Sequence, residues 1–289
     1  MINLPLAILF STLIMVTFKL FERYRIDTIQ AITVNYVVAL AFGLITYRGD
    51  LTPAEVVQLP WYPYASVIGV FFILVFFVFA TSARKVGIAI TAVSSKMSVI
   101  IPVLVGVLIM KNDSLNVVKT IGILLALIAF YLTFKKREAV SIRKRYVFLP
   151  LLLFLGNGTN DSLQSYTTYT FGTNLANHTT LMLIVVFGTA LVIGTGISLW
   201  RAVVHKVGIA PRNMIAGTVL GLLNFLSTYY FLRSLDFYPN TVFFPVFNAG
   251  IVAMSALTGL FLFKEQLRPI NKFGIVLAVI AIIVIARGG

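Results

Sequence analysis

The 289-residue sequence contains no cysteine, only two histidines, and nine acidic residues against 23 Lys and Arg. The absence of cysteine excludes disulfide scaffolds, thiolate metal sites and cysteine nucleophiles. Charged residues make up 11% of the chain and hydrophobic residues 59%, and the mean hydropathy is +0.98. These values lie far from those of soluble domains, so we expect an integral membrane protein.

The formal net charge of +14 does not indicate a nucleic-acid partner. The basic residues occupy short loops between apolar segments and form no stripe along one helix, so membrane lipids are the expected partners and nucleic acid is not. The first segment runs uncharged to Phe18 and lacks the basic start of a signal peptide, which predicts a retained first span.

Each apolar segment is expected to be a helix, because backbone groups in lipid need partners within the segment and no alternating barrel pattern occurs. The predicted fold class is therefore an all-α integral membrane protein with ten transmembrane helices. Their approximate spans are 3–21, 28–47, 61–82, 87–110, 117–135, 147–167, 177–200, 213–233, 239–263 and 269–287.

An internal repeat appears when the sequence is shifted by 152 residues. Asp113 and Leu115 then fall on Glu265 and Leu267. Gly122 and Ile123 fall on Gly274 and Ile275. Five spans per half is an odd number, so a tandem duplication predicts two five-helix inverted repeats. The predicted domains are a first repeat at 1–137, a basic linker at 138–146 and a second repeat at 147–289.

The distribution of Lys and Arg predicts the orientation of the chain. The odd-numbered loops, counted with the span ends beside them, carry 17 of these residues and the opposite side carries five, with Lys96 inside a span. The positive-inside rule places the odd-numbered loops in the cytoplasm and both termini outside.

Ten spans in a five-plus-five inverted repeat, each half ending in an acidic residue, a Leu two positions later and a Gly-containing aliphatic helix, resemble the drug/metabolite transporter superfamily of the EamA type. The pattern is clearest from Phe244 to Leu277, and a version recurs at 96–125. This resemblance covers nearly the whole chain and implies export of small metabolites. It also implies cytoplasmic termini, in contrast to the loop charges.

Two ionisable residues, Lys96 and Asp161, lie deep within predicted spans. Such a residue costs about 2.5–3.5 kcal/mol on insertion scales and marks a transport pathway or a partner. One interpretation is a salt bridge that only fixes packing; the other is binding of the carboxylate and ammonium of a substrate such as an amino acid. Asp161 is also the candidate proton-coupling group, because a low-dielectric cavity favours the neutral form of a carboxylic acid.

Asp161 shares one helix face with Asn157, Asn160 and Gln164. A polar face of this kind cannot contact lipid and must line an aqueous cavity or a polar interface. We therefore predict that these four residues bind substrate.

Asn248 is the repeat equivalent of Lys96, so the two span centres offer an amide and a cation. This asymmetry suits an asymmetric ligand, and an ordinary interhelical hydrogen bond is the alternative for Asn248. Tyr229 lies on a polar and aromatic helix face and is also predicted to bind substrate. Pro102 and Pro245 interrupt their spans and are candidate gating hinges or plain kinks.

Asp113 and Glu265, in the loops before the last span of each half, are assigned a structural role as carboxylates at helix starts. The histidines, His178 and His205, have no neighbouring acid, and no HExxH, GxSxG or Walker A motif occurs. The protein is therefore not expected to be an enzyme or to bind a cofactor or a metal. No soluble segment is long enough for a nucleotide-binding module, so transport would draw on ion gradients.

These observations predict a secondary active transporter of the inner (plasma) membrane, moving a small polar metabolite by alternating access as a proton-coupled exporter. The small-molecule substrate, protons and membrane lipids are its expected partners, and it is expected to be a monomer or a homodimer. A lipid-head-group flippase and a passive channel remain alternatives, and a membrane-embedded enzyme is the least favoured.

Overall fold

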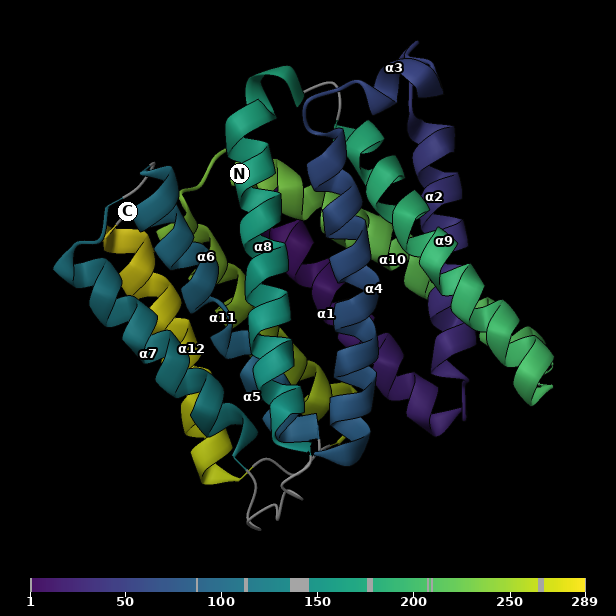
Figure 1. Ribbon diagram of the computed structural model, residues 1–289. Helices are drawn as coiled ribbons and strands as arrows, with labels where there is room; N and C mark the ends of the chain where they lie inside the picture. Colours follow the sequence, from purple (N-terminus) through teal and green to yellow (C-terminus); the bar gives the residue numbers. More distant parts are fainter. Residues whose placement is uncertain are drawn as a thin grey trace. The chain divides into compact units, whose positions relative to one another are not determined.

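The computed structural model describes residues 2–86, 88–111, 114–135, 146–175, 179–206, 208, 210–264 and 268–288. Within these ranges the chain is all-helical, with 87% helix and no strand, which confirms the predicted all-α class. The elements in chain order are α1 (Asn3–Arg23), α2 (Thr28–Thr46), α3 (Pro53–Val57), α4 (Tyr62–Lys85), α5 (Ile88–Met97), α6 (Ile100–Leu104), the π-helix η1 (Val105–Met110), α7 (Val117–Phe134), α8 (Phe148–Leu175), α9 (Thr179–His205), α10 (Pro211–Leu235), α11 (Asn240–Leu262) and α12 (Pro269–Gly288) (Figure 1).

Eight helical segments of the described chain are long and apolar enough to cross a membrane by length and composition. They are the segments of a multi-pass membrane protein. Two of the ten predicted spans are helical but fall outside this set. Val117–Thr133 is apolar but shorter, and α8 is long but carries the polar stripe that includes Asp161.

Several boundaries differ from the sequence prediction. The helices α8 and α9 continue to Leu175 and His205, beyond the predicted ends at 167 and 200. The short helix α3 was not predicted; Thr52 and Glu55 start it by exchanging side-chain and backbone hydrogen bonds as a capping box. Its sequence signal was available, but five residues are too few for a hydropathy pattern.

The chain divides into two compact units. Unit 1 comprises Met1–Ile73 and Thr167–Asp236, and unit 2 comprises Leu74–Tyr166 and Phe237–Gly289. Each unit combines helices from both halves of the sequence, so the units do not coincide with the predicted repeats at 1–137 and 147–289.

In unit 1, α2 packs against α9 and α10, and α10 also packs against α1. The contact of α10 with α2 is close because Gly217 and Gly221, four residues apart on one face, have no side chain. An added Cβ at either position would lie 2.6 Å from a carbonyl oxygen of α2, that of Ala31 or Asn35. This small-residue spacing is typical of tightly packed membrane helices.

In unit 2, α7 and α12 lie side by side and run antiparallel (Figure 1). Asn271 at the start of α12 donates 3.0 Å hydrogen bonds to the carbonyls of Leu132, Thr133 and Lys135 at the end of α7. At the opposite end, Asn116 caps the start of α7 and donates to the carbonyl of Gly288 at 2.7 Å. Two asparagines therefore satisfy carbonyls that each helix end leaves without an intrahelical partner.

Candidate functional site

The predicted helix at 87–110 is broken into α5, α6 and η1. Pro102 has no N–H to donate to the carbonyl of Ser98, and that carbonyl instead accepts from the backbone N–H of Ile101 at 2.9 Å. The break follows directly after Lys96, which lies in the last turn of α5. The negative end of the helix dipole favours a cation at this position.

Lys96 is half-buried and reaches across to α11. Its Nζ donates a 3.0 Å hydrogen bond to Oδ1 of Asn248, its repeat equivalent. The orientation of this amide is well determined, because an ammonium can only donate and Asn248 Nδ2 donates in turn to the carbonyl of Phe244 at 3.0 Å. The buried Asn248 therefore presents its oxygen to the lysine.

The polar stripe of α8 faces the same turn of α5. Asn157 Nδ2 donates to Ser95 Oγ at 3.1 Å and to the carbonyl of Leu153 at 3.1 Å. One turn further along α8, Asp161 interacts electrostatically with Lys96, the residue after Ser95. Ser95 and Lys96 of α5 thus interact with Asn157 and Asp161 of α8, which are one turn apart.

Lys96 and Asp161 do not form a direct bond. Within the part of the chain that the structure describes, no hydrogen bond or ion pair within 4.0 Å joins them, and the Asp161 carboxylate accepts no hydrogen bond. Both side chains are partly accessible rather than fully enclosed. The arrangement leaves a carboxylate and an ammonium near each other, with hydrogen-bonding capacity left for a ligand.

The other two members of the stripe are more deeply placed. Asn160 is 8% exposed, and its Oδ1 has no hydrogen-bond partner among the described residues. Gln164 is 4% exposed. The structure gives neither residue a hydrogen bond to Lys96, so the observed cluster consists of Lys96, Asp161, Asn157 and Asn248, with Ser95 as an addition that the sequence did not single out.

Sequence reasoning also missed Asn240, at the start of α11. Its Nδ2 donates to the carbonyl of Pro102 at 2.9 Å, and its Oδ1 accepts from Ser165 Oγ at 2.6 Å. Gly106 leaves the space for this side chain, since an added Cβ there would lie 2.7 Å from Asn240 Cβ. The available signal was an Asn at the start of an apolar run.

The two candidate hinges differ. Pro102 lies where the helix is broken and is followed by the π-helix η1, a form that is frequent at functional sites. Pro245 lies inside α11, and α11 continues past it without a break to Leu262. Only Pro102 therefore lies at a break of its helix, and the hinge roles stay predictions.

Tyr229, a predicted substrate-binding residue, belongs to unit 1, whereas the Lys96 cluster belongs to unit 2. Its ring stacks on Phe225 at 6.2 Å between centroids and meets Tyr230 edge to face at 5.4 Å. The guanidinium of Arg233 lies 5.7 Å from the centroid of the same ring. These contacts describe aromatic packing within unit 1.

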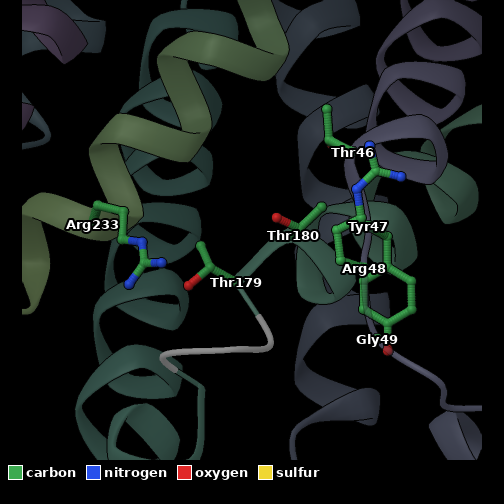
Figure 2. Close-up of a pocket in the computed structure, with 7 residues that line it drawn as sticks. All are labelled: Thr46, Tyr47, Arg48, Gly49, Thr179, Thr180 and Arg233. Atoms are coloured by element: carbon green, nitrogen blue, oxygen red, sulfur yellow. The ribbon is translucent and has the colours of Figure 1, made fainter.

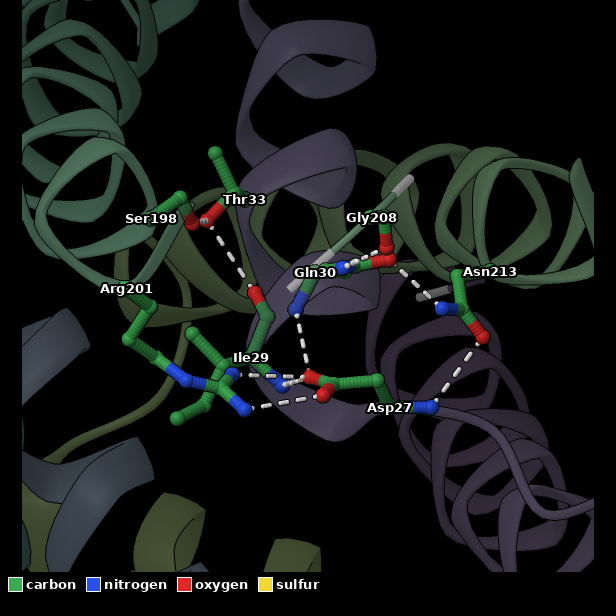
Figure 3. Close-up of polar contacts among 8 residues, drawn as sticks. All are labelled: Asp27, Ile29, Gln30, Thr33, Ser198, Arg201, Gly208 and Asn213. Atoms are coloured by element: carbon green, nitrogen blue, oxygen red, sulfur yellow. Dashed lines mark hydrogen bonds and ion pairs between the residues drawn. The ribbon is translucent and has the colours of Figure 1, made fainter. Parts of the chain in front are cut away.

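A second polar cluster, which the sequence did not predict, lies in unit 1 (Figure 3). Arg201 near the end of α9 donates two 3.0 Å hydrogen bonds, one to each carboxylate oxygen of Asp27. Asp27 also caps α2 by accepting from the backbone N–H groups of Ile29 and Gln30. Burial alone would raise the pKa of Asp27, but these hydrogen bonds and the charge of Arg201 hold it below its ordinary value.

Asn213 at the start of α10 completes this cluster. Its Oδ1 accepts from the backbone N–H of Asp27 at 3.1 Å, and its Nδ2 donates to Gln30 Oε1 at 2.6 Å. Gln30 donates in turn to the carbonyl of Gly208 at 2.8 Å. The cluster ties α2, α9 and α10 together at one end, and because Arg201 near the end of α9 meets the residue before α2, these two helices run antiparallel.

Some predicted residues lie outside the described parts of the chain. These are Asp113, Glu265, His178 and the linker at 138–146 except Tyr146.

Comparisons with known proteins place the fold but no function. No family model matches the chain. An uncharacterized protein of Haemophilus influenzae is 26% identical over 288 residues, which cover 97% of this chain and 96% of that protein. A protein of known crystal structure aligns with a TM-score of 0.74 at 14% identity, covering 98% of this chain and 94% of the other. At this identity the likeness shows only that the helical fold recurs in another protein.

Proposed function

We propose that the protein is a secondary active transporter for a small polar metabolite, such as an amino acid, and that the Lys96 cluster of unit 2 binds it. One observation carries the proposal. The ammonium of Lys96, in a segment apolar enough for a membrane, and the carboxylate of Asp161 on α8 interact electrostatically without a direct bond, and the carboxylate accepts no hydrogen bond from the described residues. Charges inside a membrane are costly and are retained mainly for function.

The contacts assign roles to the individual residues. Asn248 orients Lys96 through the 3.0 Å hydrogen bond, and Lys96 binds the substrate carboxylate. Asp161 binds the substrate ammonium or the coupling proton, so the two compete for one acid and their fluxes are linked. Asn157, Asn160 and Gln164 supply amide contacts along the same stripe of α8.

The proposal includes the architecture of ten spans in two inverted repeats, as in the EamA-type drug/metabolite transporters that the sequence resembles. Two helix pairs support it. Shifted by 152 residues, α2 corresponds to α9 and α7 to α12, and both pairs pack antiparallel, as repeats of opposite orientation require. Location in an inner (plasma) membrane, alternating access and export belong to the same proposal.

The experiment is uptake into proteoliposomes with an imposed pH gradient, screening amino acids and related zwitterions. The parent is expected to show saturable uptake and counterflow. Lys96→Ala should lose both, because no cation remains for the substrate carboxylate. Asp161→Asn should lose accumulation driven by the pH gradient. The exposed Lys272→Gln and Asp50→Asn are controls that remove the same charges elsewhere and should transport normally.

Other outcomes would decide against parts of the proposal. Normal transport per folded molecule by both Lys96→Ala and Asp161→Asn would mean that the two charged residues only stabilise helix packing. Flux that neither saturates nor shows counterflow would indicate a channel. Translocation of a fluorescent phospholipid without zwitterion transport would indicate a flippase.

A further inference from the structure

Unit 1 contains a cavity at the end opposite the Asp27 cluster. It lies where α2 and α10 end and α9 begins, and its volume is about 420 Å³. In Figure 2, Thr179 and Thr180 at the start of α9 lie between Arg233 of α10 and the segment at 46–49. The seven described residues that line it are Thr46, Tyr47, Arg48, Gly49, Thr179, Thr180 and Arg233.

The described lining residues carry two guanidinium groups and no carboxylate. Arg233 is half-buried, its side chain points toward Thr179 in Figure 2, and the ring of Tyr229 supports it at 5.7 Å. Asp236, at the end of α10, interacts electrostatically with Arg233 but is exposed and is not part of the lining. The cavity wall itself is therefore positive.

At the opposite end of α2, α9 and α10, an arginine has a carboxylate partner within the chain. There, Arg201 of α9 meets both oxygens of Asp27 at 3.0 Å. At the cavity end, the lining offers Arg48 and Arg233 hydroxyl groups but no acid. The first turn of α9 adds the positive end of its dipole on the same side.

We propose that this cavity binds an anionic group, a carboxylate or a phosphate. Arg233 and Arg48 contact it with their guanidinium groups, which match the geometry of both anions, and the hydroxyls of Thr179 and Thr180 donate hydrogen bonds. The volume lies in the range of small-molecule sites, so the anion is carried by a small metabolite or by a lipid head group. This site is separate from the Lys96 cluster and does not rest on the proposed transport function.

The test measures binding in nanodiscs of zwitterionic lipid by calorimetry, with inorganic phosphate and succinate as soluble probes. A parallel arm replaces part of the lipid with phosphatidylglycerol and follows the shift in unfolding temperature. The variants are Arg233→Gln, Arg48→Gln and Thr179→Val. Arg212→Gln is the matched control, because Arg212 is an exposed arginine at the other end of α10.

The expected result is binding of a probe that weakens at least tenfold in Arg233→Gln and Arg48→Gln and less in Thr179→Val, with no change in Arg212→Gln. Binding of phosphate or succinate identifies a soluble anion, and stabilisation by phosphatidylglycerol alone identifies a lipid head group; both support the site. Absence of any effect in the parent, or equal weakening in Arg212→Gln, would overturn it. Circular dichroism checks that each variant is folded.

Discussion

The two polar clusters of this protein contain similar groups and arrange them differently. In unit 1, Asp27 accepts two 3.0 Å hydrogen bonds from Arg201 and two more from the backbone. In unit 2, Lys96 bonds to an amide, and Asp161 interacts with it only electrostatically. A charge pair satisfied within the chain holds helices together, whereas a pair kept apart retains capacity for a ligand.

The largest effect on stability is expected from Arg201→Ala. Removing this partner leaves Asp27 partly buried without its counter-charge, so the free energy of unfolding should fall by about 2 kcal/mol. Thermal unfolding in detergent measures this, with the exposed Arg212→Ala as a control. The double variant Arg201→Ala/Asp27→Ala should lose less free energy of unfolding than the sum of the losses of the two single variants. Strict additivity would contradict a stabilising interaction between the two side chains.

A smaller loss is expected at Asn240 in unit 2, which joins α11 to the broken helix through Pro102 and also accepts from Ser165. Asn240→Ala should lower the free energy of unfolding by about 1 kcal/mol, near the range measured for interhelical hydrogen bonds in membranes. Ser165→Ala removes only one of these bonds and should cost less. If it costs as much, the bond to the carbonyl of Pro102 contributes little.

The pH dependence of stability offers a third comparison. The pKa of Asp27 lies below its ordinary value of 3.8 in the folded protein. Its contribution is therefore fully present above about pH 4 and is lost as the pH falls through the folded pKa. Asp27→Asn should flatten the decline of unfolding temperature as the pH falls below about 4; an unchanged decline would assign it to other carboxylates.

The smallest effect is expected at Ser198, whose hydroxyl lies 2.7 Å from that of Thr33. Thr33 keeps its bonds to the carbonyls of Ile29 and Gly194, so Ser198→Ala should cost about 0.5 kcal/mol. A loss as large as that of Arg201→Ala would mean that the hydroxyls, rather than the charges, hold this end of α2 and α9.

The sequence predicted the helical class and singled out Lys96, Asp161 and Asn157, which the structure places in one cluster, because hydropathy and helical periodicity are local. The internal repeat aligned Lys96 with Asn248, and the structure joins these two residues by a hydrogen bond. The repeat gave the correspondence, but the contact itself depends on how α5 and α11 pack.

Other features had no local signal. Asp27 and Arg201 are separated by 174 residues. Arg201 was counted only for the orientation of the chain, and Asp27 stood in a loop. Pro102 predicted an interruption, but not the π-helix that follows it, where the Asn240 side chain lies beside Gly106. The cavity in unit 1 likewise forms from three helix ends far apart in the chain.

The most direct test of the contrast between the clusters measures zwitterion flux and unfolding temperature together for Asp161→Asn and Arg201→Ala. We expect opposite patterns: Asp161→Asn loses proton-coupled accumulation and keeps the parent's unfolding temperature, while Arg201→Ala unfolds at a lower temperature and keeps its flux per folded molecule. If Asp161→Asn instead lowers the unfolding temperature and transports normally, both clusters are structural and the proposed site is wrong.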